Sequence, residues 1–270
     1  MTDSDSRLVE NLLAQPEVHR QWAGGYRTRD NESFFERAFD LVTAELHPPA
    51  GATFLDAGCG SCAHTVRLAR RGFNVRAVDF SESALEMART HLKETGLDER
   101  ITLQREDLTR LSFPDASFDY VLCWGVLMHV PDVGRAVAEL SRVLRPGGSL
   151  VVSEVNMHSL EARTMRGLKR LLGRERAEVK ETPAGLEYWK ERGGGALVTR
   201  QANMRWLIES FESHGLRLSK RLAGQFSESY TILSAPALKR LVHGFNSFWF
   251  GRVKSPGPAF GNVLIFKKRK

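Results

Sequence analysis

Residues 54 to 62 constrain the fold of this chain more than any other stretch. The segment FLDAGCGSC is an apolar run that ends at Asp56 and continues into a turn containing Gly58 and Gly60. A helix-like stretch, Ala63 to Arg71, follows directly. A strand, a glycine turn and a helix in this order open a doubly wound α/β sheet and place a ligand at the carboxyl end of the strand. We therefore expect a ligand site at this turn.

The carboxylate of Asp56 narrows the choice of ligand. A glycine turn also serves dinucleotides, and with Ala63 the segment can be written G-x-G-x-x-A. A pyrophosphate on the backbone N–H groups of the turn would be repelled by Asp56, whereas a ligand with an ammonium group and no phosphate would be favoured. S-adenosylmethionine (SAM) is such a ligand. The competing class is a dehydrogenase that uses a nicotinamide cofactor.

Two more acids follow where a nucleoside binder needs them. Asp79 ends the predicted strand NVRAVD, 21 residues after the first glycine of the turn. A carboxylate there accepts from both ribose hydroxyls, and its charge excludes a 2′-phosphate. The predicted strand Ile101 to Leu108 ends at Asp107, which can accept from an adenine amino group while Leu108 packs on the ring. A dehydrogenase would leave Asp107 and Leu108 without a role.

Taken together, the motifs resemble those of the class I SAM-dependent methyltransferases. They are LDAGCGSC, AVDFS, EDL, FDYVLCWGVLMHVPD and LRPGGSLVVSEV, which cover roughly residues 50 to 156. The resemblance implies an α/β fold, a Rossmann-like doubly wound seven-stranded sheet with helices on both faces and the last strand antiparallel. Two residues depart from the pattern: the third glycine of the family's loop is Cys62, and the first histidine of a common L-H-H segment is Met128.

The resemblance also implies a set of site residues. His129 follows the fourth strand and is the candidate general base; the alternative is a helix-start histidine satisfied by its neighbours. Tyr26, beside the Gly24-Gly25 break, is expected to cover the cofactor from an N-terminal helix, with packing on the sheet as the alternative. The expected cofactor-binding residues are Tyr26, Asp56, Gly58, Gly60, Asp79, Phe80, Asp107, Leu108, Cys123 and Trp124.

The chain divides into a short N-terminal part and an elaborated core. We expect residues 1–48 to form a helical cap over the cofactor, and residues 49–270 to form the methyltransferase domain. Insertions near 157–199 and 225–261 are expected to form a substrate lid, because loops at the ligand edge of a sheet carry specificity.

The irregular pattern after the fifth strand predicts the following elements. Residues 160–180 are helix-like, and 181–199, with a run of three glycines, is typical of a flexible connection. Thr199 is expected to cap a helix over 200–214. The last two strands are expected at 216–222 and 262–268.

An aromatic cluster in the second insertion speaks to the methyl acceptor. Phe245, Phe248 and Trp249 lie beside basic residues and could wall an apolar acceptor pocket, sit at a membrane interface or pack as a satellite core. Of the two functional interpretations we favour the pocket.

Charge is distributed unevenly. Residues 1–150 hold 17 Lys and Arg against 22 Asp and Glu. Residues 151–270 hold 22 Lys and Arg against 10 Asp and Glu, and the whole chain has a net charge of +7. The basic C-terminal part indicates an anionic acceptor, an anionic surface or simply a solvated face. The tail FKKRK could touch RNA phosphates, but no recognised RNA-binding motif accompanies it, so nucleic acid is an unfavoured partner.

Cysteine usage and the N-terminus bear on location. Three cysteines suit a reducing cytoplasm better than a disulfide framework. The polar start MTDSDSRLVEN lacks the apolar core of a secretion signal, and no apolar run is long enough to cross a bilayer. We expect a cytoplasmic protein without stable membrane insertion. The C-x-x-C spacing of Cys59 and Cys62 is explained by the glycine loop, so no metal is expected.

The sequence thus predicts a SAM-dependent methyltransferase that acts on a small or medium-sized organic acceptor, anionic or apolar. The reaction would be an in-line displacement at the sulfonium methyl by an acceptor O, N or C. An RNA methyltransferase and a non-catalytic SAM-binding protein are the alternatives. The oligomeric state is left open.

Overall fold

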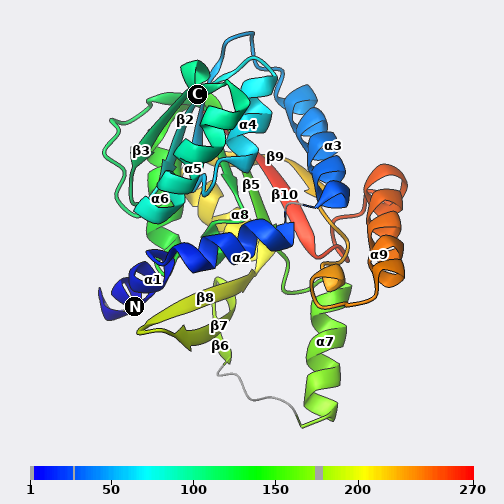
Figure 1. Ribbon diagram of the computed structural model, residues 1–270. Helices are drawn as coiled ribbons and strands as arrows, with labels where there is room; N and C mark the ends of the chain where they lie inside the picture. Colours follow the sequence, from blue (N-terminus) through cyan, green and yellow to red (C-terminus); the bar gives the residue numbers. More distant parts are fainter. Residues whose placement is uncertain (1–2, 27, 174–178) are drawn as a thin grey trace.

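A seven-stranded sheet forms the centre of the structure, a computed structural model that describes residues 3–26, 28–173 and 179–270 (Figure 1). The strand order is β3-β2-β1-β4-β5-β10-β9. The first five strands run parallel, and β10 is antiparallel to both of its neighbours. The predicted doubly wound sheet with an antiparallel last strand is therefore confirmed. The strands are Thr53–Ala57 (β1), Asn74–Asp79 (β2), Ile101–Arg105 (β3), Phe118–Trp124 (β4), Leu144–Val155 (β5), Leu216–Ala223 (β9) and Gly261–Lys268 (β10).

Helices cover both faces of this sheet. One apolar core lies between the sheet and α6 and α8, where Val137, Leu140 and Phe211 are buried. The other lies between the sheet and α3, α4 and α5, where Phe39 and Leu85 are buried. The central strands are apolar on both sides, as expected of a sheet covered on both faces. The helices are Arg29–Leu46 (α3), Ala63–Arg70 (α4), Glu82–Thr95 (α5), Val133–Val143 (α6) and Met204–Ser213 (α8).

Side chains at the helix starts set where these helices begin. Thr28 accepts from the backbone N–H of Asn31 at the start of α3, and Ser81 accepts from the N–H of Ala84 at the start of α5. Each bond satisfies a backbone donor that the first turn of a helix leaves without an intrahelical partner. Ser81 lies two residues after Asp79, so α5 begins directly beside the carboxyl end of β2.

A second, three-stranded antiparallel sheet occupies the first insertion and corrects the prediction for residues 181–199. Instead of a flexible connection, the chain forms β6 (Val179–Thr182), β7 (Gly185–Arg192) and β8 (Gly195–Ala202). Buried positions alternate along β8. One of these inward positions is Arg200, which pairs with Glu187 across the sheet. A charge at an inward position is not expected of a strand, so the sequence did not predict one here.

The predicted start of the next helix is also wrong. Thr199 lies within β8, and α8 begins at Met204 after an N-cap at Asn203, whose side chain accepts from the N–H groups of Arg205 and Trp206. Pairing with β7 holds residues 199–202 extended, so the helix cannot begin earlier.

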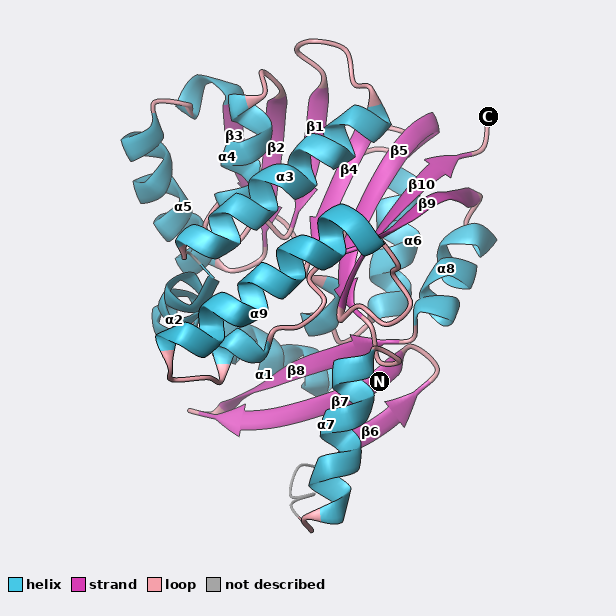
Figure 2. Cartoon of the chain, turned by 90° about the vertical axis from the view of Figure 1, so that its right-hand side faces the viewer, coloured by secondary structure: helices cyan, strands magenta, loops and turns pink. Residues whose placement is uncertain are grey.

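The remaining helices lie outside the two layers that cover the main sheet. α1 (Asp3–Leu13) packs against β8, and α2 (Pro16–Tyr26) contacts α5. α7 (Leu160–Leu171) projects from the body, and α9 (Pro236–Phe248) lies on the same side of the molecule (Figure 2). Short turns complete the chain at Asp98–Arg100, Leu127–His129 (η2), Ser229–Thr231 and Trp249–Val253. None of the helices in the described ranges is long and apolar enough to cross a membrane.

Candidate active site

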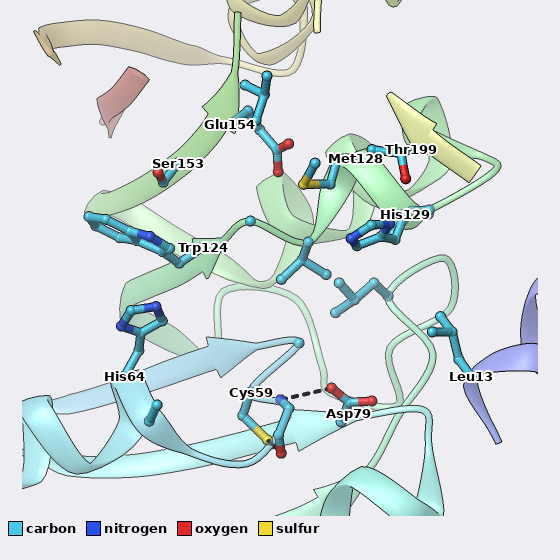
Figure 3. Close-up of a pocket in the computed structure, with 18 of the residues that line it drawn as sticks. Leu13, Cys59, His64, Asp79, Trp124, Met128, His129, Ser153, Glu154 and Thr199 are labelled. Carbon is cyan, nitrogen blue, oxygen red and sulfur yellow. Dashed lines mark hydrogen bonds between the residues drawn. The ribbon is translucent and has the colours of Figure 1, made fainter. Parts of the chain in front are cut away.

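A cavity of about 490 Å³ lies at the carboxyl ends of the parallel strands. Its volume falls within the range of small-molecule sites. Asp79 and Cys59 lie on one side of it, and Trp124, Met128 and His129 lie across from them (Figure 3). This is the edge of a doubly wound sheet where ligands bind.

The turn after β1 forms the floor of the cavity. Gly58 has φ +85°, and a Cβ at this position would lie 2.5 Å from the side chain of Val126, so only glycine fits. Cys62, which replaces the family's third glycine, also adopts a left-handed conformation with φ 65°. Its side chain is fully buried in the core and does not line the cavity. The cysteine therefore leaves the ligand side of the turn open.

Asp79 is held at the cavity wall by two backbone donors. The N–H of Gly60 donates to Oδ2 at 2.9 Å (Figure 3). The N–H of Ser81 donates to Oδ1, also at 2.9 Å. Burial raises the pKa of this carboxyl, and the two backbone bonds oppose the rise. Each carboxylate oxygen keeps capacity for a further hydrogen bond. The arrangement can accept two hydroxyl donors, as a ribose presents.

Phe80, Asp107 and Leu108 line the cavity next to Asp79. The carboxylate of Asp107 is oriented by Thr109, whose N–H and hydroxyl both donate to Oδ1 at 2.8 Å. An apolar surface beside an oriented acceptor is suited to a purine ring with an exocyclic amino group.

Two of the predicted cofactor-binding residues do not line the cavity, and the side chain of a third is not described. Asp56 is buried beneath the turn, where the hydroxyl of Thr65 donates to it at 2.6 Å, and it does not line the cavity. Burial raises the pKa of Asp56 to about 7. Cys123 is likewise buried in β4 away from the lining. The side chain of Tyr26 lies outside the described residues. Direct contact of these three with a cofactor stays a prediction.

His129 lines the cavity as a neutral imidazole. It sits in η2 after β4, and its Nδ1 lies 2.8 Å from the carbonyl oxygen of Val198. Burial lowers the pKa of His129 to about 4, and the charge of Arg200 acts in the same direction. Because a carbonyl can only accept, the hydrogen is on Nδ1 and the lone pair is on Nε2. Near neutral pH the ring is therefore unprotonated at Nε2.

An aromatic group forms another wall of the cavity. The ring of Trp124 lies 5.3 Å from that of His64 and 6.2 Å from that of Phe35, and His64 stacks on Phe39 at 5.1 Å. Burial lowers the pKa of His64 well below its usual value, and the charge of Arg67 adds to this. Nothing in the sequence marked His64 for an aromatic wall beyond its place at the start of α4. This wall is suited to an apolar or aromatic part of a ligand.

The N-terminal helices reach the cavity beside Asp79. Val9, Leu13 and His19 contribute to the lining. Nε2 of His19 lies 2.7 Å from the carbonyl oxygen of Leu13 and 3.0 Å from the hydroxyl of Ser81. These contacts fasten the junction between α1 and α2 to the start of α5.

Arg200 ties the small sheet to the loop that carries His129. Its guanidinium is 2% exposed and pairs with Glu187 at 2.8 Å. It also donates to the carbonyl oxygens of Leu127, Val130 and Pro131 at 2.8, 3.0 and 3.2 Å. Sequence reasoning missed this pair because the segment was interpreted as a flexible connection. Residues 196–202, ALVTRQA, show no clear alternation of apolar and polar side chains, so the sequence held no signal for the pair.

Glu154, at the end of β5, is a second residue that sequence reasoning missed. The N–H of Leu127 donates to its Oε1 at 2.8 Å, whereas its Oε2 is buried without a hydrogen-bond partner in the described part of the chain. Burial raises the pKa of Glu154 to about 8. Glu154 therefore supports η2 in its protonated form at neutral pH.

The predicted aromatic wall from the second insertion is wrong. Phe245, Phe248 and Trp249 do not line the cavity. They pack on one another and on Phe226, with Phe226 to Trp249 at 4.5 Å. From this insertion, Gln225 and Glu228 line the cavity instead.

Over the described residues, no group of three or more His, Cys, Asp or Glu is placed to hold a metal ion.

Comparison with known proteins decides the family. A family model described as "Methyltransferase domain" matches residues 55–152. The chain is 30% identical to the ubiquinone biosynthesis O-methyltransferase of Hahella chejuensis over 175 residues, which are 64% of this chain and 70% of that protein. The chain belongs to the class I SAM-dependent methyltransferases.

Two other relatives match this chain over a smaller share of their length. Methyltransferase GfsG of Streptomyces halstedii is 34% identical over 44% of each chain. The 27-O-demethylrifamycin SV methyltransferase of Amycolatopsis mediterranei is 30% identical over 56% of each chain. The chain thus spans about half the length of these two curated relatives.

Solved structures share the fold of this methyltransferase. The magnesium protoporphyrin IX methyltransferase of Synechocystis, with bound SAH, has a TM-score of 0.64 and 16% identity, over 98% of this chain and 100% of that one. The [4+2]-cyclase SpnF has a TM-score of 0.57 and 22% identity, over 87% and 80%. Because a cyclase shares the fold, the reaction must be argued from the site.

The buried carboxyl of Glu154 predicts a pH-dependent stability. Its pKa is about 8 in the fold against an ordinary 4.5. The stability that it contributes is present below the ordinary pKa and is lost as the pH rises through about 8, because above that value the folded protein must hold an unsolvated charge. The melting temperature of Glu154→Gln, relative to that of the parent, should therefore rise as the pH is raised from about 5 to about 9. A constant difference across this range would contradict the assignment.

Proposed function

We propose that this chain is a SAM-dependent methyltransferase that transfers a methyl group to O, N or C of a small or medium-sized organic acceptor. The observation that carries the proposal is the cavity itself, in which Asp79 faces the glycine turn on one side and His129 and Trp124 lie on the other. One side has the donors and acceptors that a nucleoside needs. The other is apolar and holds a neutral base.

The residues present fit SAM. Asp79 would accept from the ribose hydroxyls, and Phe80 and Leu108 would enclose the adenine while Asp107 accepts from its amino group. The turn of Gly58 and Gly60 would take the amino-acid part of the ligand. Asp56 would add negative charge from beneath the turn, which favours an ammonium group over a phosphate.

The N-terminal helices and the two insertions would enclose the reactants. We assign residues 1–48 to a cap over the cofactor, because Val9, Leu13 and His19 border the cavity next to Asp79. Leu197 and Thr199 of the first insertion border the cavity as well, and so do Gln225 and Glu228 of the second. This supports a role of the insertions as a substrate lid.

The free cysteines support a reducing, cytoplasmic location.

SAM, when bound, supplies an activated methyl group. The work of the protein is then to align the acceptor with that methyl and to exclude water. The aromatic wall at Trp124 would position the acceptor. For a hydroxyl acceptor, Nε2 of His129 would take the proton, and the bond from Nδ1 to Val198 would hold the ring in the required tautomer.

Charge in the cavity favours an apolar acceptor over an anionic one. Arg67 is the sole lysine or arginine among the described lining residues, and its guanidinium pairs with Glu32 and Glu36. The lining also includes the acids Glu10 and Glu228. The basic excess of the C-terminal part therefore lies elsewhere. The relatives named as O-methyltransferases support oxygen as the methylated atom.

Binding of SAM tests the cofactor assignment. By isothermal titration, SAM and its demethylated product should bind and NADP should not. Asp79→Ala should weaken SAM binding by about 1.5 to 3 kcal/mol, roughly ten- to a hundredfold, because two hydrogen bonds to a charged group are lost. Asp107→Ala should cost less, and Asp119→Ala, at an exposed site away from the cavity, should change nothing. Unchanged SAM affinity in a folded Asp79→Ala protein would refute the ribose assignment.

A further inference from the structure

Large exposed apolar side chains gather in the two insertions. In the described part of the chain, every large apolar side chain that is exposed lies between residues 160 and 253. Most of them belong to α7 and α9, which lie on the same side of the molecule (Figure 2). They are Leu160, Met165, Leu168, Leu171 and Leu172 at α7, Val179 in β6, and Ile232, Leu238, Leu241, Phe245, Phe248 and Val253 at and around α9.

Helix α7 turns its apolar side away from the protein. Ala162 is buried, and Arg166, one turn later, donates to Gln201 and to the carbonyl oxygen of Met157. These residues mark the side that faces the body. At about 3.6 residues per turn, Leu168 and Leu171 lie on the opposite side. They are 49% and 83% exposed.

Helix α9 also exposes an apolar stripe. Asn246 is buried and bonds the backbone N–H and carbonyl of Ser227, so this side faces the body. Leu238, Leu241, Phe245 and Phe248 follow a spacing of three and four residues along another side, and are 48%, 70%, 42% and 54% exposed. An amphipathic helix normally buries such a stripe. Both α7 and α9 expose their apolar stripes, which indicates a surface that binds a partner.

The same two segments carry unpaired positive charge. Arg163, Lys169 and Arg170 belong to α7, and Lys239, Arg240, Arg252 and Lys254 belong to α9 and the turn after it. Over the described residues, none of these seven cations forms an ion pair with a carboxylate. Glu161 is the only acid in either helix.

The structure assigns α7 and α9 to docking on an anionic lipid bilayer, with the exposed Leu and Phe side chains at the boundary of headgroups and acyl chains and the Lys and Arg side chains among the headgroups. Apolar residues interleaved with cations match such a surface, to which affinity comes from buried apolar area and from attraction to anionic lipid. A second copy of this chain is disfavoured as occupant, because its seven cations would face these seven.

The α7/α9 surface reaches the rim of the cavity. Gln225 and Glu228 line the cavity, and Phe226 between them packs on Phe245 at 5.0 Å and on Trp249 at 4.5 Å. A bilayer on this surface would bring an apolar acceptor dissolved in it close to the cavity. This consequence rests on the proposed function, whereas docking itself does not.

Sedimentation of the full chain with vesicles tests the inference. The protein should sediment with vesicles of mixed phosphatidylcholine and phosphatidylglycerol, and far less with phosphatidylcholine alone. Binding should fade in about 1 M NaCl, where the Debye length falls to about 3 Å. Leu171→Glu combined with Leu241→Glu should reduce binding at least about tenfold, because two apolar contacts are replaced by charges that anionic lipid repels.

A matched control carries the same charge change elsewhere. Thr90→Glu combined with Thr102→Glu, both exposed on α5 and β3 at the other edge of the sheet, should bind vesicles as the parent does. Melting temperature and SAM binding confirm that both double variants are folded. Absence of binding to anionic vesicles, equal loss in the control, or a parent dimer in sedimentation velocity that Leu171→Glu/Leu241→Glu dissociates would each overturn the inference.

Discussion

Arg200→Ala should lower the free energy of unfolding by about 3 to 5 kcal/mol, since it leaves the carboxylate of Glu187 buried without its partner. The carbonyl oxygens of Leu127, Val130 and Pro131 lose their donor at the same time. Breaking a buried pair from one side is costly because the remaining charge is neither solvated nor paired. Denaturant unfolding measures this loss as a lower midpoint.

Two further variants separate the buried pair from a general effect of losing arginine. Arg200→Met combined with Glu187→Gln removes both charges and should recover much of the loss. Arg205→Ala, which breaks a pair at the surface of α8, should leave stability unchanged. A loss for Arg200→Ala no larger than that for Arg205→Ala would show that the pair does not hold the small sheet to the main one.

His129→Ala should lower kcat by about 10² to 10⁴ when the acceptor is a hydroxyl, the usual contribution of a positioned general base. The neutral imidazole faces the cavity from η2, and Val198 fixes its tautomer. SAM affinity should stay close to that of the parent, because Asp79 and the turn lie across the cavity. The rate of methyl transfer from labelled SAM and a parallel binding titration measure the two effects.

The kcat of His129→Ala, read together with its melting temperature, distinguishes a base from a packing role for His129. With a pKa of about 4, the imidazole is neutral throughout the neutral range, so the parent's kcat should show no loss from His129 between about pH 6 and about pH 8. Unchanged kcat in His129→Ala, with a lower melting temperature, would assign His129 to packing alone.

The parts of the fold that could be predicted follow local patterns. Buried parallel strands are continuous apolar runs with an acid or a glycine at the carboxyl end, so β1, β2 and β4 could be located. The order of these strands places their ends at one edge, which is why Asp79, Asp107 and Trp124 meet at the cavity as expected.

The strands of the first insertion could not be predicted because a buried ion pair lies among their inward side chains. β7 and β8 turn Glu187 and Arg200 inward, and a strand whose inward positions include charges has no clear apolar alternation. Each charge is compensated by the other across the pair of strands, 13 residues away in the chain, and the pairing appears only once the strands are formed. Glu154 was missed for a similar reason, since its burial depends on the fold of η2 above it.

The second insertion shows the opposite case. Its apolar spacing is helical and correctly suggests an amphipathic segment, but spacing does not say which side faces the protein. The structure turns Phe245 and Phe248 outward and leaves the cavity rim to Gln225 and Glu228. For this reason Phe245 and Phe248, which we expected in the wall of the cavity, lie at the surface of the protein instead.

Transfer of label from methyl-labelled SAM tests the central claim most directly. Incubated with SAM and an extract of small organic metabolites, the protein should release the demethylated cofactor and place the label on a low-molecular-weight product, and Asp79→Ala should slow this transfer when SAM is limiting. SAM that binds but is never consumed, or label found on RNA in place of a small molecule, would contradict the account.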